Sequence, residues 1–421
     1  MWAKASSEYL FLFSLFILTL FTARSAVRLI MVLAPISVIF AAYLVVFCID
    51  KFRKSEGDIG KLIFGIFAIL VILLIVFVFW NFYGSAKSQA SMMVPSMYNQ
   101  QWQKAMDWVR SSTPTNAVFA HWWDYGYWVQ SIGERATVLD GGNVITYWNY
   151  LMGRLVLTGD NQEDALEFLY NHNATHLLID SSDIGKYGAF SIIGSDENYD
   201  RYSWIPVMVS DLSQVQESAN GTTRIYQGGS ATDEDIIYKE NGQNIFLPGK
   251  SAAIGGVFVT YAQEGDSVTF EQPKAAFFYQ GKQINIPIRY LQFKDQFVDF
   301  GSGLEGTVSL VQNLIPSSGG ISVDDFGGLI YISPRVMRGY LAQKYLLDDP
   351  FDNFPNFEIA HVEQNFIVES LNNQGLELGD FVIYQGLQGP IKIWDIEYTG
   401  VEKEKIEYLD IDASKYLDWE L

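Results

Sequence analysis

Long apolar stretches occupy the beginning of the chain. Residues 29–49 and 62–83 are almost unbroken apolar runs, and each is long enough to cross a hydrocarbon layer of about 30 Å as a helix. A shorter apolar stretch at residues 9–21 could by itself be a signal peptide. Because two longer stretches follow it, we predict three transmembrane helices within residues 1–84.

The loop between the second and third stretches is basic, since it contains Lys51, Arg53, Lys54 and Lys61. The positive-inside rule places such a loop in the cytoplasm. We therefore expect a multi-pass protein of the cell membrane, with everything from about Gly84 onward on the extracellular side. In this orientation Arg24 and Arg28 lie at the outer face, against the usual charge bias. Each could bind a charged ligand or reach lipid phosphate groups.

After residue 84 the apolar positions alternate between the spacing of helices and the spacing of strands. Helices are predicted at residues 97–109 and 163–170, and strands at residues 116–120, 137–139 and 175–180. Helices and strands that alternate along a chain are typical of an α/β domain. We assign this domain to residues 85–241.

From about residue 242 the pattern changes to short β-prone runs separated by Gly, Asp, Asn and Pro. This pattern predicts a β-sandwich-like domain over residues 242–334. Helical spacing returns at residues 335–347, and residues 335–421 are predicted to form a mixed β/α C-terminal domain. The expected fold class is N-terminal transmembrane helices followed by a mixed α/β outer domain and β-rich C-terminal domains.

Composition narrows the possible functions. A net charge of −20 argues against a surface that binds nucleic acid. The chain has one cysteine, Cys48, so no disulfide can form within it. Disulfides are common in secreted eukaryotic proteins, so their absence mildly disfavours such an origin. The four histidines do not have the spacing of a metal site with cysteines.

Residues Trp122-Trp123-Asp124-Tyr125-Gly126 form the most unusual string in the chain. Large rings supply apolar walls and indole N–H donors. A carboxylate supplies strong hydrogen-bond acceptors, and a glycine lets the backbone turn tightly or approach a ligand. The string therefore predicts a ligand pocket. The alternative is a buried aromatic turn in which Asp124 caps a helix or bonds to backbone.

The string resembles the WWDYG motif of the catalytic subunit of oligosaccharyltransferase, and the chain resembles the C-terminal portion of the archaeal type. This resemblance implies a glycosyltransferase that moves an oligosaccharide from a lipid-phosphate-linked donor to asparagine in Asn-X-Ser/Thr sequons. It implies that Trp122 and Trp123 line the acceptor site. It also implies that Asp124 accepts a hydrogen bond from the sequon hydroxyl.

A second element, Asp183-Ile184-Gly185-Lys186, resembles the DxxK part of the family's second motif. The resemblance adds Asp183 and Lys186 to the acceptor site. Four residues after the lysine, Phe190 stands where the family has a methionine or isoleucine that contacts the threonine methyl group. Ile192 and Ile193 follow closely. Taken alone, a DxxK pattern fits a solvated ion pair equally well.

Arg28 lies in residues 25–35, a segment that resembles the family's "VRL…L.P" stretch. The family arginine contacts the phosphates of the lipid-linked oligosaccharide, and this role is carried over to Arg28 alone. A guanidinium group suits a diphosphate because its forked donors bind oxygen atoms in pairs.

The resemblance also implies a divalent cation, Mn²⁺ or Mg²⁺, which together with acidic residues activates the asparagine amide. The family's acidic motifs precede the point where this chain begins. We therefore expect no metal ligand and no catalytic residue here, and a chain that carries the acceptor-reading part of a longer enzyme. The implied partners are the lipid-linked oligosaccharide, acceptor polypeptides and the membrane, with no nucleic acid.

Two other classes of function fit the same residues. A membrane-anchored carbohydrate-binding protein would stack sugar rings on the exposed tryptophan and tyrosine side chains, and Asp124 would bind hydroxyl groups. A cell-surface structural protein would have no site at all.

Overall fold

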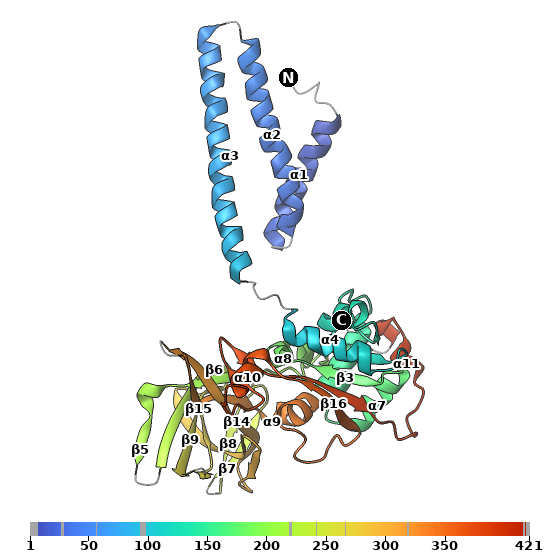
Figure 1. Cartoon of the computed structure of the whole chain (residues 1–421), viewed down its shortest axis with the longest axis vertical. Helices are drawn as coiled ribbons and strands as arrows, with labels where there is room; N and C mark the ends of the chain where they lie inside the picture. Colours follow the sequence, from blue (N-terminus) through green and yellow to red (C-terminus); the bar gives the residue numbers. More distant parts are fainter. Residues whose placement is uncertain are drawn as a thin grey trace. The chain divides into compact units, whose positions relative to one another are not determined.

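The computed structural model of the 421-residue chain describes residues 7–26, 29–55, 57–92, 98–218, 221–240, 242–265, 267–317, 320–415 and 417. It contains two compact units, Met1–Met97 and Tyr98–Leu421, both drawn in Figure 1. The predicted fold class is confirmed, because apolar N-terminal helices precede a mixed α/β region and a β-rich region.

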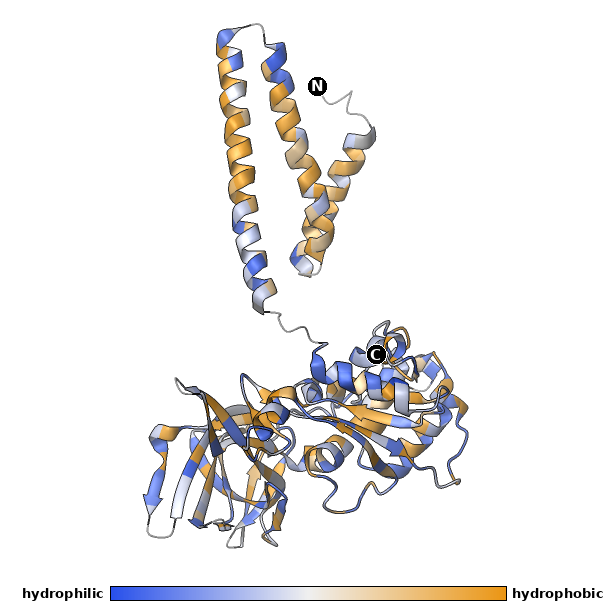
Figure 2. Ribbon diagram, in the orientation of Figure 1, coloured by the Kyte–Doolittle hydropathy of each residue, from blue (hydrophilic) through white to orange (hydrophobic). Residues whose placement is uncertain are grey.

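The described part of the first unit consists of α1 (Ser7–Ser25), α2 (Ile30–Lys54) and α3 (Asp58–Met92). Helices α2 and α3 are long and apolar enough to cross a membrane, whereas α1 contains a shorter apolar helix, Tyr9–Ser25. Figure 2 shows hydrophobic residues along the middle of these helices and hydrophilic residues toward their ends. A helix that is apolar on all sides is typical of a membrane span. Two of the three predicted spans therefore have spanning length.

The second unit begins with α4 (Gln100–Ser112), an amphipathic helix. Its buried face includes Trp102, Ala105, Met106 and Val109, which recur at the spacing of helical turns. The Asn99 side chain caps the helix by accepting a hydrogen bond from the backbone N–H of Trp102 at 3.1 Å. The predicted helix at residues 97–109 is confirmed, although both of its ends lie further along the chain.

The first sheet of this unit has five strands. In spatial order they are β16 (Phe357–Glu363), β19 (Ile391–Ile396), β3 (His176–Ile179), β1 (Val118–Ala120) and β2 (Ala136–Thr137). Strand β1 is parallel to both β2 and β3, and β19 is antiparallel to β3. All four residues of β3 are buried, as expected for a strand covered on both faces.

The helices of this α/β part are α5 (Gly126–Ser131), α6 (Thr146–Leu151), which continues into a π-helical turn (Met152–Leu157), α7 (Gln162–Asn171) and α8 (Ser182–Ile193). Helix α7 confirms the helix predicted at residues 163–170, and β1 and β3 confirm two of the predicted strands.

The second sheet has twelve strands, and a separate hairpin lies beside it. Its strands are β4 (Val207–Ser210), β5 (Gln216–Ser218), β6 (Gly221–Ala231), β9 (Ala253–Glu264), β10 (Ser267–Phe270), β11 (Lys274–Tyr279), β12 (Lys282–Phe293), β13 (Gln296–Asp299), β14 (Leu304–Ser317), β15 (Gly320–Ile332), β17 (Val382–Ile383) and β18 (Leu387–Gln388). The hairpin pairs β7 (Ile236–Glu240) with β8 (Gln243–Leu247). The unit also contains the short helices α9 (Pro334–Met337), α10 (Phe366–Asn372) and α11 (Ile406–Leu409), a π-helical turn (Leu341–Leu346) and two 3-10 turns (Leu212–Gln214 and Ala413–Lys415).

The β-rich region begins at Val207, well before residue 242, where the sequence pattern placed it. The reason is visible in β6, in which only Tyr226 is buried, so the strand lacks a clear alternation of apolar and polar residues. The C-terminal residues also differ from expectation, because β16 and β19 join the first sheet while β17 and β18 join the second. The bounds of the four domains given above stay predictions.

Candidate functional site

The WWDYG string forms the connection between a strand and a helix. Strand β1 ends at Ala120, residues Trp123–Tyr125 make one 3-10 turn, and α5 begins at Gly126. The DxxK element has the same setting, since β3 ends at Ile179 and α8 begins at Ser182. Because β1 and β3 are parallel neighbours, their carboxyl ends lie at the same sheet edge, where ligands commonly bind in open α/β sheets.

Gly126 lets α5 pack directly on the following segment of the chain. A Cβ atom at this position would lie 2.4 Å from the Cα of Asp140 and 2.6 Å from the carbonyl oxygen of Leu139. Such distances are too short for any side chain, so the glycine of the string serves this close approach.

Lys186 connects the two motifs. Its Nζ lies 3.0 Å from Oδ2 of Asp124 and donates a hydrogen bond of 2.9 Å to the hydroxyl of Tyr125. The ammonium group also lies 4.4 Å from the centre of the Tyr125 ring, a favourable cation–π position. The Asp124 side chain is one-third exposed. Asp124 and Lys186, each predicted to belong to the same site, therefore meet at the surface.

A buried hydrogen-bond network lies behind this ion pair. The Tyr125 hydroxyl donates to Oδ1 of Asp183 at 2.7 Å and lies 2.9 Å from the Ser182 hydroxyl. The backbone N–H of Asp180 donates to the second oxygen of Asp183 at 3.1 Å. The network thus fixes the tyrosine hydroxyl that holds Lys186.

Burial shifts the protonation equilibria of this network. Asp183 has no exposed surface, and burial raises the pKa of its carboxyl to about 7, although Lys186 acts in the opposite direction. Burial also raises the pKa of Asp180. The pKa of Tyr125 lies well above its ordinary value because of burial and the two neighbouring carboxyl groups, so the hydroxyl keeps its proton.

The two tryptophans have different environments. Trp122 is buried, and its ring meets that of Phe190 edge-on at a centroid distance of 5.6 Å. Trp123 is half-buried, and its indole Nε1 is a buried donor without a hydrogen-bond partner among the described residues. Buried N–H groups are nearly always paired, so this donor is a candidate for binding a ligand oxygen.

Phe190 has no exposed surface and packs against both Trp122 and Tyr187. It therefore lies beneath the aromatic wall, whereas Ile192 and Ile193 are 42% and 36% exposed. Ile193 stands seven residues after Lys186, so two helical turns place the two side chains on the same side of α8. Arg28, the predicted phosphate ligand, lies outside the described residues.

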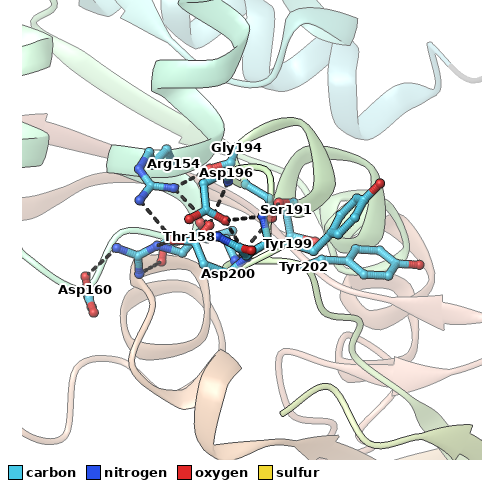
Figure 3. A network of polar contacts seen from close by, with 12 residues as sticks. Arg154, Thr158, Asp160, Ser191, Gly194, Asp196, Tyr199, Asp200 and Tyr202 are labelled. Carbon is cyan, nitrogen blue, oxygen red and sulfur yellow. Dashed lines mark hydrogen bonds and ion pairs between the residues drawn. The ribbon is translucent and has the colours of Figure 1, made fainter. Parts of the chain in front are cut away.

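The C-terminal end of α8 is anchored by contacts that the sequence analysis did not identify. Arg154, in the π-helical turn, forms two hydrogen bonds with Asp200, at 3.0 and 2.9 Å, and donates a third to the Gly194 carbonyl oxygen at 3.1 Å. Figure 3 shows these residues together. A Cβ on Gly153 would lie 2.5 Å from the Phe190 carbonyl oxygen, so the turn and the helix touch through backbone.

Tyr125, Asp180 and Ser182 also belong to the site, although no role was predicted for them from the sequence. One local signal was available, because Asp and Ser commonly precede helices, and Oδ1 of Asp180 accepts the backbone N–H of Ser182 at 2.8 Å. His121, next to the tryptophans, is buried and hydrogen-bonded to the Trp122 carbonyl oxygen at 2.8 Å. Burial lowers the pKa of His121 to about 4, so its ring is neutral at pH 7.

The arrangement does not fit a divalent cation. Within the described ranges, no group of three or more His, Cys, Asp or Glu side chains could hold a metal ion. The closest carboxyl groups, Asp180 and Asp183, are buried and bonded to neighbouring donors, and the Lys186 ammonium lies 4.0 Å from Asp183.

Residues 115–172, which include the WWDYG string, match the family model described as STT3/PglB/AglB core domain. Over these residues the chain is similar to the STT3/PglB/AglB core domain. The resemblance inferred from the string is thereby confirmed. The curated relatives that match are named as glycotransferases or as a glycosyltransferase subunit.

One such relative is dolichyl-phosphooligosaccharide-protein glycotransferase 1 of Pyrococcus horikoshii, which is 29% identical over 195 residues, or 46% of this chain and 20% of the relative. The glycotransferase 1 of Pyrococcus furiosus is 31% identical over 26% of this chain and 11% of the relative. The subunit stt3 of the Schizosaccharomyces pombe dolichyl-diphosphooligosaccharide–protein glycosyltransferase is 30% identical over 20% of this chain and 11% of the relative. The matches thus span a fifth or less of these relatives.

Two solved structures of STT3/PglB/AglB proteins are also similar. One is the C-terminal domain of pglb from C. jejuni, with 8% identity and a TM-score of 0.35 over 70% of this chain and 99% of that domain. The other is the C-terminal globular domain of the oligosaccharyltransferase from Pyrococcus abyssi, with 12% identity and a TM-score of 0.32 over 70% of this chain and 50% of that domain. The matched relatives lend no support to a carbohydrate-binding or structural protein.

Proposed function

We propose that this chain is the acceptor-binding part of a glycosyltransferase that transfers an oligosaccharide from a lipid-phosphate-linked donor to asparagine in Asn-X-Ser/Thr sequons. One observation carries the proposal. The Asp124 carboxylate, one-third exposed and held by Lys186, belongs to the residue that follows Trp123, whose indole N–H has no partner among the described residues. The core-domain match supports this proposal, since it includes the string that contains both groups.

The chemistry of this pair suits a hydroxyl group. One oxygen of Asp124 binds Lys186, which leaves its second oxygen to accept the hydroxyl hydrogen of a sequon threonine or serine. The indole N–H of Trp123 can donate to the oxygen of the same hydroxyl. A residue without a hydroxyl would leave the second oxygen of Asp124 and the indole N–H of Trp123 without a partner, and such sites discriminate strongly.

The remaining predicted residues have supporting roles in this proposal. Asp183, through the Tyr125 hydroxyl, positions Lys186, and Lys186 positions Asp124. Phe190 supports the ring of Trp122 from beneath. Because Phe190 is buried and Ile193 is exposed, we assign the contact with the threonine methyl group to Ile193 in place of Phe190.

The proposal also covers binding of the lipid-linked donor and the location of the chain. Two helices of spanning length indicate association with a membrane. We propose that the second unit is extracellular and that Arg28 binds the donor phosphate. The divalent cation implied by the family resemblance is also part of the proposal, and no residue of this chain is assigned to it.

Photo-crosslinking of sequon peptides to the chain in membranes tests the acceptor site. An Asn-Ala-Thr peptide should label the chain, whereas an Asn-Ala-Val peptide, which has the same shape without the hydroxyl, should not. Asp124→Ala should abolish labelling while the second unit still unfolds in one cooperative transition. Asp107→Ala is the matched control, since Asp107 is a 68% exposed carboxylate paired with Arg110 on the surface of α4. Labelling that ignores both the threonine hydroxyl and Asp124 would refute the proposal.

A further inference from the structure

A separate pocket of about 340 Å³ lies in the second unit and shares no residue with the WWDYG site. Its lining residues are Asp160, Tyr290, Glu305, Pro334, Met337, Arg338, Gln343, Phe351 and Asn353. They come from the loop after the π-helical turn Met152–Leu157, from β12 and β14, from α9 and the residue after it, from the π-helical turn Leu341–Leu346, and from the loop that follows that turn. The volume lies in the range of small-molecule sites, roughly 300–1,000 Å³.

One side of the pocket is aromatic. Phe351 is 39% exposed, and its ring meets that of Tyr290 edge-on at a centroid distance of 5.3 Å. Phe297 supports the same ring at 5.5 Å and a right-angle orientation of 88°. Phe351 is therefore held in place by two rings while part of its surface stays open. Such a surface packs well against the C–H groups on one face of a ligand ring.

The pocket also contains a buried acceptor that lacks a partner. Gln343 is 3% exposed, and its Nε2 donates to the Met337 carbonyl oxygen at 2.6 Å. Its Oε1 has no hydrogen-bond partner within the described part of the chain. This oxygen is itself closed to solvent, so a ligand would reach it only after the side chain turns toward the pocket. The exposed amide of Asn353 adds both a donor and an acceptor.

The charges of the pocket are already balanced. Asp160 is bound by Arg201 at 3.0 Å, as the dashed line at Asp160 in Figure 3 indicates. The other two charged lining residues are also paired, Glu305 with Arg289 at 3.4 Å and Arg338 with Glu234 at 2.9 Å. No lining charge is left for a charged ligand, so the pocket favours a neutral one.

We propose that this pocket binds a neutral saccharide unit. A pyranose ring has one apolar C–H face, which would pack on Phe351, and a rim of hydroxyl groups that both donate and accept. Its hydroxyl groups would bind the exposed amide of Asn353 and the paired carboxylates. The inference rests on this pocket alone and does not depend on the proposed function. It differs from a lectin-like role of the tryptophan string, because no residue is shared.

Saturation-transfer NMR on the full chain tests this proposal. The chain is placed in lipid nanodiscs, because detergents with sugar head groups would compete for the pocket. The probes are methyl glycosides of glucose, galactose, mannose and N-acetylglucosamine, with glucuronate as an anionic probe and spermidine as a cationic one. We expect at least one neutral glycoside to bind more tightly than either charged probe. Binding of spermidine or glucuronate alone would overturn the proposal.

Variants of pocket residues test whether the glycoside binds in this pocket. Phe351→Ala should weaken binding roughly fivefold or more because the stacking surface is lost, while Phe351→Trp should retain it. Phe278→Ala is the matched control, since Phe278 is 45% exposed and lies in β11 outside the pocket. Asn353→Ala removes an exposed amide with little risk to folding and should also weaken binding. Unchanged affinity in both Phe351→Ala and Asn353→Ala, or no neutral glycoside bound at all, would overturn the assignment.

A separate arm of the same experiment tests which molecule supplies the sugar. A lipid-linked oligosaccharide and a glycosylated peptide are each titrated as competitors against the bound glycoside, and the better competitor identifies the source. Asp124→Ala should leave glycoside binding unchanged. If sequon crosslinking fails while a glycoside still binds, only the proposed function fails. If the reverse occurs, only this inference fails.

Discussion

At the scale of single residues, the proposed acceptor site depends on Lys186. This side chain bonds Asp124 at the surface and the hydroxyl of Tyr125 beneath it. A lysine ammonium group has three donors, and two of them are used here, so the direction of the Asp124 carboxylate is fixed before any ligand arrives. Such pre-organisation lowers the entropic cost of binding.

Replacing the ammonium group should therefore weaken hydroxyl recognition. We expect Lys186→Met to lower the affinity for an Asn-Ala-Thr peptide roughly tenfold, or about 1–2 kcal/mol, because Asp124 loses a charged hydrogen bond. Affinity for Asn-Ala-Val should barely change, so the preference for threonine shrinks. Fluorescence titration of both peptides measures this ratio, and Lys104→Met is the control at another ion-paired lysine of the same unit. An unchanged ratio would show that Lys186 does not position Asp124.

Asp183 should make the second unit less stable as pH rises, which is the opposite of the usual effect of a carboxyl group. The pKa of Asp183 is raised to about 7 in the fold, so the folded chain holds a proton that the unfolded chain loses near its ordinary pKa of about 4. Its stabilising contribution is complete below pH 4 and disappears as pH rises through about 7. Asp183→Asn should remove this dependence. Denaturant unfolding of both proteins at several pH values between 4 and 8 measures the difference, which should grow with pH; parallel curves would contradict the assignment.

The residues of the site could be predicted in part. The string and the DxxK element indicated Trp122, Asp124 and Lys186, and the structure brings Asp124 and Lys186 together. The buried contacts could not be predicted, because they depend on how two loops meet at one sheet edge. The burial of Phe190 is the clearest example. Its position in the sequence matches a ligand-contacting residue, whereas its orientation follows from the packing of α8.

At the scale of elements, the site is held by close packing of backbone against backbone. Helix α5 meets residues 139–140 through Gly126, and the end of α8 meets the π-helical turn through Gly153 and Gly194. The periodic helices α4 and α7 and the buried strand β3 could be predicted from the sequence. The strands between residues 207 and 240 could not, because they are half-exposed and carry many polar residues.

Two glycines near the site should respond in opposite ways to alanine. Gly126→Ala should destabilise the second unit by about 1–3 kcal/mol, because the new Cβ would overlap Asp140. Gly185→Ala should stabilise it by about 0.5–1 kcal/mol, since this glycine lies within α8 and has no heavy atom within 4 Å of the added Cβ. Denaturant unfolding measures both. Equal effects of the two substitutions would disprove the role assigned to Gly126.

At the scale of the whole molecule, chain segments far apart in sequence build the sheet that presents the site. Strand β19 lies between β16 and β3, so residues near the C-terminus complete a sheet begun by residues near Val118. Sequence patterns of single segments do not specify such pairing, which is why the C-terminal residues were expected to form a domain of their own. The hydrophobic core that includes Phe119 also includes Ile393.

A core substitution in β19 should therefore weaken the site from a distance. Ile393 is fully buried between Leu178 and His361 of the neighbouring strands. Ile393→Ala should lower the free energy of unfolding by about 2–5 kcal/mol and reduce sequon labelling at elevated temperature. Ile406→Ala is the control, since Ile406 is 82% exposed and should change stability by no more than about 0.5 kcal/mol. A loss of stability without any loss of labelling would mean that the C-terminal strands do not support the site.

The central claim is that Asp124 recognises the acceptor sequon of a glycan transfer reaction by binding its hydroxyl group. The most direct test is glycan occupancy, measured by mass spectrometry, at a single Asn-Ala-Thr sequon of a reporter protein in cells whose own copy of the chain carries Asp124→Ala. We predict that occupancy falls to the level seen when the reporter sequon is changed to Asn-Ala-Val, while Asp107→Ala leaves it unchanged. Full occupancy in the Asp124→Ala cells would contradict the account.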